Sequence, residues 1–404
     1  MAIAGNGRGA GGLVLIGFAE AYAAIEAAWS LQAAGFTVHA FTRAGEKPAL
    51  RRARRVELHE VTAPELDARR TVEDVQALIR SLQPAAYLPL DDGAVWLAGE
   101  LDPGDAVVAG PTGAAVDYAL DKDLQIAAAR AAGLNVPATK VVESVSDIAL
   151  EPDEYPVVVK PARALYSVDG RLVRPTGKVA ADATELAGLA DDEWYPPLLV
   201  QPLVRGIGEG LFGHATADGV IGWSAHRRIR MLNPQGSASS ACASHAVDEA
   251  LLEPAKRFLS QIGWRGLFML EFLRDGEGTP WFMELNGRAW GSLALARRRG
   301  FEYPAWTVRA ALDGGFAPAV PMRPPDVVCR HLGMELVHLA FVLRGPSSSA
   351  LDEWPRVWPT VRALARVRRG DRLYNWKRSQ PDVLLADTAK MLRIFLGKAL
   401  GSRS

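Results

Sequence analysis

A pair of neighbouring strands late in the chain constrains the fold more than any other feature of this sequence. Leu267–Phe272 and Thr279–Leu285 are mostly apolar segments of strand length. The turn-forming residues Asp275-Gly276-Glu277-Gly278 stand between them, so the pattern predicts a β-hairpin. A hairpin places the two segments side by side, with side chains alternating between two faces.

Four polar side chains of this hairpin are expected on one face. Glu284, Asn286 and Arg288 alternate along the second strand, and Glu271 can join them from the first. Two carboxylates and an amide oxygen are hard ligands that suit Mg²⁺ bridging polyphosphate oxygens. The guanidinium suits phosphate or carboxylate oxygens. The alternative is a solvated face with ordinary ion pairs, and two upstream lysines argue against it.

These lysines stand where phosphate groups could be met. Lys160 ends the apolar segment Tyr155–Lys160, which predicts a buried strand whose last ammonium group faces a cleft. Lys122 stands at the start of the predicted helix Asp121–Ala132, where the helix dipole disfavours a cation. That mismatch favours a ligand-binding role. An ordinary solvated lysine is the alternative in both cases.

A basic strand precedes a loop of small residues. In His226-Arg227-Arg228-Ile229-Arg230, strand alternation places Arg228 and Arg230 on one face and Arg227 on the other. The segment Gly236–Ser240 that follows leaves backbone amides room to approach oxygens. We interpret the strand as a contact for substrate or phosphate, with a plain surface face as the alternative. No triad partner for a histidine is visible, so nucleophilic hydrolase chemistry has no support.

The first part of the chain alternates strand and helix signals. Short apolar segments such as Leu13–Phe18 and Ala85–Leu90 alternate with helical stretches such as Glu20–Ala34, which predicts a doubly wound α/β domain over residues 1–118. The turn Gly17-Phe18-Ala19-Glu20 lacks the three-glycine fingerprint of dinucleotide binding, so an oxidoreductase is rejected. Asp91-Asp92 follows a strand end, where it either lines a substrate cleft or caps a helix.

The rest of the chain divides into three further parts. Residues 119–200 and 201–320 are expected to be α+β, and residues 321–404 a small, mostly helical extension. Within residues 119–200, the polar segment Arg163–Lys178 predicts a mobile loop. From Leu351 onward twelve Lys/Arg face five Asp/Glu, which indicates a packed helix with a solvated basic face, or else a surface for acidic partners or membrane.

Composition narrows the class of protein. Acidic and basic residues balance at 46 each, so no global field recruits nucleic acid or membrane. The two cysteines, Cys242 and Cys329, have no metal-ligand spacing and are expected to be free thiols. No window approaches the roughly 20 apolar residues of a membrane-spanning helix. We therefore expect a cytoplasmic protein.

Taken in order, these motifs resemble the ATP-grasp superfamily. The resemblance spans residues 13–315 and looks closest to the branch of carbamoyl-phosphate synthases and carboxylate–amine ligases. It rests on Asp121-Lys122, Val157–Pro161, Val200–Val204, Glu271 and Glu284-Leu285-Asn286-Gly287-Arg288. It implies an N-terminal α/β domain followed by two α+β lobes that clasp ATP between them.

The resemblance also implies roles for single residues. Lys122 and Lys160 would contact the nucleotide phosphates. Glu271, Glu284 and Asn286 would hold two Mg²⁺ ions, with Glu284 bridging and Mn²⁺ as a substitute. Arg288 would neutralise the transferring phosphoryl group or the acyl phosphate, and the basic strand with Arg228 and Arg230 would lie near the acceptor carboxylate.

Adenosine recognition would fall to a hinge between the lobes. Gln201, Leu203 and the Pro202 carbonyl would read adenine through backbone groups, and Glu209 would bind the ribose. Pro202 departs from many relatives, which have an acidic residue there, and it offers no amide hydrogen. Adenine recognition would then depend more on Leu203. The loop Ala162–Thr176 is also poorer in glycine than many phosphate-covering loops.

The resemblance implies an ADP-forming ligase. A carboxylate would attack the ATP γ-phosphorus to give an acyl phosphate, and an amine would then displace phosphate to form an amide or peptide bond. The expected partners are ATP, a small carboxylate and an amine, with amino-acid-like substrates favoured and a homodimer left open. The alternatives are an enzyme that makes carbamoyl or carboxy phosphate or phosphorylates another group, and a nucleotide-binding module without turnover.

Overall fold

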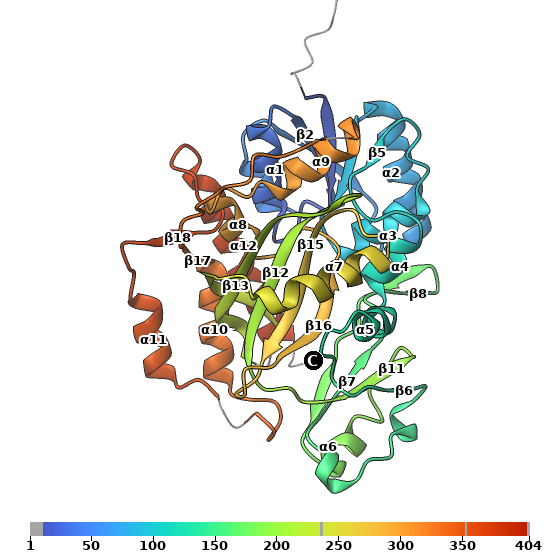
Figure 1. Cartoon of the computed structure of the whole chain (residues 1–404), viewed down its shortest axis with the longest axis vertical. Helices are drawn as coiled ribbons and strands as arrows, with labels where there is room; N and C mark the ends of the chain where they lie inside the picture. Colours follow the sequence, from blue (N-terminus) through green and yellow to red (C-terminus); the bar gives the residue numbers. More distant parts are fainter. Residues whose placement is uncertain (1–10, 235–236, 315, 352–353, 402–404) are drawn as a thin grey trace, which may run out of the picture.

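A computed structural model describes residues 11–234, 237–314, 316–351 and 354–401 of the chain. Three larger sheets and one two-stranded sheet organise these residues, and Figure 1 shows the N-terminal part at the top and the smaller antiparallel sheet at the lower right. Among the described residues, none of the helices combines the length and apolar character that crossing a bilayer demands. Both cysteines are buried free thiols, as expected.

The N-terminal part is a parallel sheet with helices on both faces. Its strands are β1 (Leu13–Gly17), β2 (Thr37–Arg43), β3 (Val56–Val61), β4 (Ala86–Pro89) and β5 (Val107–Val108), in the order β3-β2-β1-β4-β5. The helices are α1 (Ala24–Ala33), α2 (Ala68–Leu82), α3 (Asp92–Glu100) and α4 (Ala114–Leu120), with a 3₁₀ turn at Ala49–Arg52.

Alternation along the strands explains the two helical layers. Val14 and Ile16 of β1 pack with the side chains of α1, whereas Leu15 between them packs with Val75 of α2 and Leu97 of α3. Strands buried on both faces need apolar residues at successive positions, which is what Leu13–Phe18 supplies. The doubly wound domain predicted from the sequence is confirmed.

The next part is a smaller antiparallel sheet, seen in green at the lower right of Figure 1. Its strands, in the order β10-β7-β11-β6, are β6 (Lys140–Val142), β7 (Val157–Pro161), β10 (Lys178–Ala180) and β11 (Leu198–Pro202). Helices α5 (Lys122–Ala131) and α6 (Ala183–Gly188) accompany it, with 3₁₀ turns at Val145–Asp147 and Pro152–Glu154.

A seven-stranded sheet forms the centre of the molecule. Its order is β16-β15-β12-β13-β14-β17-β18. The strands are β12 (Ile207–Thr216), β13 (Gly219–Asn233), β14 (Ser237–His245), β15 (Gly266–Arg274), β16 (Pro280–Asn286), β17 (Val328–Arg330) and β18 (Asp371–Leu373). The accompanying helices are α7 (Leu252–Gln261), α8 (Leu293–Arg298) and α9 (Tyr303–Asp313), with a 3₁₀ turn at Glu249–Leu251.

Two apolar layers cover this sheet and join it to the neighbouring parts. Phe258 of α7 and Ala129 of α5 pack with Leu270 on one face. Met269 on the other face packs with Tyr303 of α9 and with the N-terminal sheet and α1. These two apolar clusters pack the central sheet against α5 on one face and against the N-terminal part on the other.

The C-terminal segment is more than a helical extension. It contains α10 (Leu332–Arg344), α11 (Val357–Ala365) and α12 (Pro381–Gly401), drawn in red in Figure 1. It also supplies two strands of the central sheet, β17, which pairs with β14, and β18, which pairs with β17 and forms the edge. These strands have three residues each, too short for a periodic pattern to reveal them.

A hairpin occupies the segment that the sequence predicts to be a mobile loop. Strands β8 (Tyr166–Val168) and β9 (Arg171–Val173) pair with each other. The Ala68 amide donates to the Gly170 carbonyl at 2.8 Å, and the Leu172 amide donates to the Pro64 carbonyl at 2.8 Å. The turn thus docks on the N-terminal part, a long-range contact that local composition does not encode.

Candidate active site

Two carboxylates lie directly opposite each other on the last hairpin of the central sheet. Glu271 of β15 is the cross-strand partner of Glu284 of β16. The Asn286 side chain, two residues further along β16, lies with its Nδ2 at 3.4 Å from Glu284 Oε1. Glu271, Glu284 and Asn286 therefore gather on one face, as the alternation of the sequence predicts.

Two cations approach this carboxylate pair from different elements. Lys122 Nζ, at the first residue of α5, lies 3.9 Å from Glu284 Oε2. Arg228 of β13 places Nη2 at 2.6 Å from Glu271 Oε1, and its side chain is only 6% exposed. Glycine at position 208 makes room for it, because a Cβ there would lie 2.5 Å from Arg228 Cδ.

Lys160 of the smaller antiparallel sheet brings a third cation. It is the fourth residue of β7, and its ammonium group is close enough to interact with Lys122, Glu284 and Glu271. Burial and the charge of Lys122 lower the pKa of Lys160 to about 8, while the two carboxylates partly oppose that shift. A buried cation beside another cation is a position that gains from an anionic ligand.

Arg288 links the site to the N-terminal part. Its Nε donates to Asp92 Oδ1 at 3.0 Å, and Arg174 Nη2 lies 2.8 Å from Asp92 Oδ2. Burial alone would raise the pKa of Asp92, but the charges of Arg288 and Arg174 outweigh it and lower that pKa. Asp92 thus joins three parts of the molecule at the margin of the candidate site.

The neighbouring aspartate has a different role. Asp91 accepts a hydrogen bond from the Ala94 amide at 2.8 Å, which makes it the N-cap of α3. The sequence left open whether this acidic pair lines the cleft or caps a helix. Asp91 caps the helix, and Asp92 binds the two arginines.

The donor set fits a divalent cation with hard ligands. Like charges directly opposite each other across a ladder are destabilising, and Glu271 and Glu284 form such a pair. An ion between them would remove that repulsion. A half-turn about the last bond of the Asn286 side chain exchanges the amide nitrogen and oxygen, so that the oxygen can face the ion. Carboxylate and amide oxygens are what Mg²⁺ takes in proteins.

Comparisons with known proteins concern the fold of the whole chain. No family model matches the sequence, and no curated protein matches it. Among solved structures, an L-amino acid ligase from Bacillus licheniformis has a TM-score of 0.56 at 17% identity, with 77% of each chain covered. A biotin carboxylase from Campylobacter jejuni has a TM-score of 0.57 at 15% identity, covering 76% of this chain and 72% of that one.

A third structure is an enzyme complexed with ADP. It is N5-carboxyaminoimidazole synthetase from Staphylococcus aureus complexed with ADP, with a TM-score of 0.59 at 14% identity over 80% of this chain and 82% of that one. All three belong to one fold family. The chain has the ATP-grasp fold. The expected fold class is confirmed, and at these identities the likeness concerns the fold alone.

Within this ATP-grasp chain, Glu209 does not join the predicted site. The residue of β12 that pairs with Glu271 is Gly210, so Glu209 points to the opposite face. There it is 6% exposed and binds Arg227 Nη2 at 2.7 Å and Arg274 Nε at 2.8 Å. Both of its carboxylate oxygens are thus paired within the sheet, and its role as ribose ligand stays a prediction that this geometry does not support.

The predicted hinge residues have partners within the protein. Gln201 Nε2 donates to Thr139 Oγ1 at 2.9 Å, and the side chain is 3% exposed. The Leu203 amide donates to the Pro156 carbonyl at 2.8 Å, so it is not available for adenine. Pro202 pairs with Val157 at the exposed end of β11 and keeps its place as a carbonyl candidate.

Arg230 is the other residue that departs from expectation. Its guanidinium binds Glu335 of α10 rather than the carboxylate pair. The cause is a bulge: Arg228 pairs with Cys242 and Arg230 with the adjacent Ala241, so the two arginines point to opposite faces. The predicted shared face is wrong, and Gly236 of the following loop lies outside the described residues.

Two residues at the site have no strong signal in the sequence. Arg174 lies in the segment expected to be a loop, and only the three-dimensional contact with Asp92 shows its position. Gly208 looks like any strand glycine until the space needed by Arg228 is known. An arginine in a polar segment can equally well face solvent, so the sequence alone does not predict its binding partner.

Proposed function

We propose that this chain is an ATP-dependent ligase that activates a carboxylate as an acyl phosphate and transfers the acyl group to an amine. The observation that carries the proposal is the meeting of Lys122, Lys160 and Arg228 with the Glu271–Glu284 pair from three separate elements. Such a cluster matches the charge pattern of a metal-bound triphosphate, with cations for phosphates and carboxylates for the metal.

Each part of the cluster has its own task in this proposal. Glu271, Glu284 and Asn286 would hold Mg²⁺, which neutralises charge on the phosphates and which Mn²⁺ could replace. Lys122 and Lys160 bind phosphate oxygens of ATP. Binding there also relieves the repulsion between the two ammonium groups, so the ligand is favoured by the charges already in place.

Two arginines handle the substrate side. Arg228 holds Glu271 in position and would meet the acceptor carboxylate beside it. Asp92 fixes the Arg288 guanidinium, which also interacts with Glu284. Arg288 can then stabilise the charge that spreads over the transferring phosphoryl group, which is where most catalysis of this reaction arises.

The reaction needs protection from water. In the proposed mechanism the substrate carboxylate attacks the γ-phosphorus, ADP leaves, and the amine then attacks the acyl carbon and releases phosphate. The β8–β9 hairpin is fixed to the N-terminal part, and Arg174 just after it binds Asp92 at the margin of the site, where this segment would help to exclude water. Excluding water protects the acyl phosphate from hydrolysis.

The substrates proposed are amino acids or small peptide-like acids and amines. Support comes from the fold shared with an L-amino acid ligase and from the cationic residue Arg228 beside the metal ligands. A screen tests this directly: pairs of amino acids are incubated with Mg-ATP and the chain, and ADP release is measured.

The expected result is ADP release that requires both an acid and an amine. Bicarbonate belongs in the screen as an acid, because release with bicarbonate alone would favour formation of carboxy phosphate. No release with any pair, together with intact ATP binding, would favour a nucleotide-binding module. The proposal as stated would then be wrong.

A further inference from the structure

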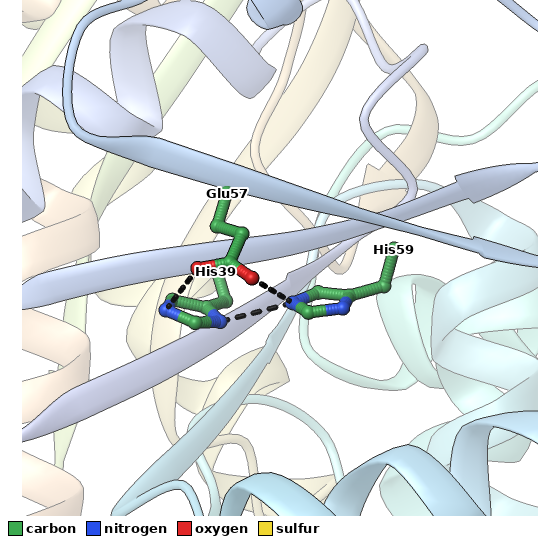
Figure 2. Close-up of side chains that lie close together, drawn as sticks. All are labelled: His39, Glu57 and His59. Carbon is green, nitrogen blue, oxygen red and sulfur yellow. Dashed lines mark hydrogen bonds and ion pairs between the residues drawn. The ribbon is translucent and has the colours of Figure 1, made fainter.

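Three potential metal ligands gather in the N-terminal sheet, away from the central sheet that carries the carboxylate pair. They are His39 of β2 and Glu57 and His59 of β3, shown in Figure 2. Across the residues that the structure describes, this is the one group of three or more His, Cys, Asp or Glu side chains whose ligand atoms lie within 4.8 Å of one another. The ATP site does not use any of them.

The parallel pairing of two strands explains why they converge. His39 is the direct partner of Glu57, and His59 follows Glu57 by two residues on the same strand. Residues two apart on a strand share a face, so all three side chains leave the sheet on the same side. The backbone therefore holds the group together without any ligand.

The distances between the ligand atoms are short. His39 Nδ1 lies 2.9 Å from His59 Nε2. Glu57 approaches both rings, with Oε2 at 3.6 Å from His39 Nε2 and Oε1 at 3.9 Å from His59 Nε2. In Figure 2 the ring of His39 lies between the carboxylate and the ring of His59.

We propose that His39, Glu57 and His59 form a binding site for a divalent transition-metal ion of the zinc class. Two imidazoles and one carboxylate are ligands that Zn²⁺ takes in proteins, with bonds of about 2.0–2.2 Å. Tetrahedral bonds of that length separate neighbouring ligand atoms by about 3.3 Å. His39 faces His59 with Nδ1 and Glu57 with Nε2, and an ion would take only one of these nitrogens. One ligand atom from each residue lies within 4.8 Å of the others, so rotation of the side chains would bring the three atoms to bonding distance of one ion.

The surroundings favour an open site with a water as fourth ligand. The His39 and His59 rings are 13% and 21% exposed, whereas the Glu57 side chain is 66% exposed. Solvent therefore reaches the group from the side of the carboxylate. Three protein ligands and one open position describe an exchangeable site rather than a closed structural one. The ion would tie β3, the edge strand of the sheet, to β2.

This site differs chemically from the one proposed for ATP. Imidazole nitrogens suit zinc, cobalt, nickel and copper, whereas Mg²⁺ takes oxygen ligands. Millimolar Mg²⁺ should therefore fill the carboxylate pair of the central sheet without displacing zinc from the histidines. The two sites can be measured separately in one protein.

The test is a zinc titration of the full chain, prepared without a histidine tag and with millimolar Mg²⁺ present. We expect one Zn²⁺ per chain, loss of that ion in His39→Gln and in His59→Gln, and retention in Glu284→Gln. His245→Gln, which changes a histidine outside the group, is the matched control. Cobalt in place of zinc should give the visible absorption of a tetrahedral site in the wild type, Glu284→Gln and His245→Gln, and not in His39→Gln or His59→Gln.

Thermal unfolding keeps the proposal testable even if a histidine variant is less stable. Zinc should raise the melting temperature of the wild type and of His245→Gln, and leave that of His59→Gln unchanged. Zinc binding of equal stoichiometry in all variants, or no zinc bound by the wild type, would overturn the proposal.

Discussion

Glu284 is the residue on which most contacts of the candidate site converge. Lys122 reaches one of its oxygens, Asn286 the other, and Glu271 stands directly across the ladder. Its side chain is 34% exposed, enough to meet a ligand without rearrangement of the sheet. A neutral group at this position would keep the shape of the site but lose its charge.

Glu284→Gln should therefore lower ADP formation by about three orders of magnitude, because a charged ligand of the proposed Mg²⁺, which neutralises the transferring phosphoryl group, is lost. Steady-state ADP release measures the effect, and circular dichroism should show an unchanged fold. Glu277→Gln, in the exposed turn of the same hairpin, is the control and should retain full activity. Undiminished turnover in Glu284→Gln would remove the metal assignment.

Single residues also show how far sequence reasoning reaches. Strand alternation was sufficient to place Glu271, Glu284 and Asn286 together, because a regular hairpin obeys a period of two. The role of Glu209 came from the resemblance and not from alternation, and the face on which Glu209 lies depends on the register between β12 and β15. Register is set by the whole sheet, so a motif spacing alone could not supply it.

At the scale of elements, the bulge in β13 decides which arginine serves the site. Arg228 and Arg230 are two residues apart, and a regular strand would have placed both beside Glu271. The shift at Ile229 sends Arg230 to Glu335 of α10 instead. Bulges arise from pairing with a partner strand, and β14 was not predicted from the sequence.

This separation gives opposite phenotypes for two similar substitutions. Arg228→Met should lower ADP formation by about a hundredfold, since a charge-assisted contact worth about 2–3 kcal/mol disappears. Arg230→Met should instead destabilise the packing of α10 by about 2 kcal/mol and leave activity largely unchanged. Melting curves and turnover measured on both variants distinguish them. The reverse pattern would show that Arg230, not Arg228, is at the site.

At the scale of the whole molecule, buried neutral groups couple folding to pH. His214 is 1% exposed and His226 2% exposed. Burial lowers the pKa of His214 to about 4, and burial together with Arg228 lowers that of His226 to about 3. Both values lie below the unfolded value of about 6.5, so the unfolded chain binds more protons in acid.

The free energy of unfolding should therefore fall as pH drops from about 6.5 to 4.5, by about 2 kcal/mol for each histidine. Urea unfolding at several pH values measures this slope. His214 Nδ1 lies 3.2 Å from the Thr307 hydroxyl, and an asparagine side chain can keep this hydrogen bond without titrating. His214→Asn should therefore make the free energy of unfolding depend less on pH. His245→Asn, at a more exposed position, should not, and an equal slope in all three proteins would contradict the assignment.

The arrangement of the parts follows partly from the sequence. Alternating strand and helix signals give the N-terminal part, and the hairpin gives the centre of the site. The β17 and β18 strands and the docking of the β8–β9 hairpin depend on contacts between distant segments. Asp92 illustrates the difference, since its partners Arg174 and Arg288 lie 82 and 196 residues away along the chain.

We propose above that Lys122 of α5 and Lys160 of β7 form one Mg-ATP site with the carboxylates of the β15–β16 hairpin. Calorimetric titration with ATP, with and without Mg²⁺, tests it on the wild type and on Lys160→Ala. Losing one charge-assisted phosphate contact should weaken binding about 10- to 100-fold. Lys140→Ala, which changes an exposed lysine of the same small sheet, should bind normally.

We expect one ATP per chain, bound more tightly with Mg²⁺ and weakened in Lys160→Ala alone. Equal affinity for ATP in Lys160→Ala and the wild type would contradict it.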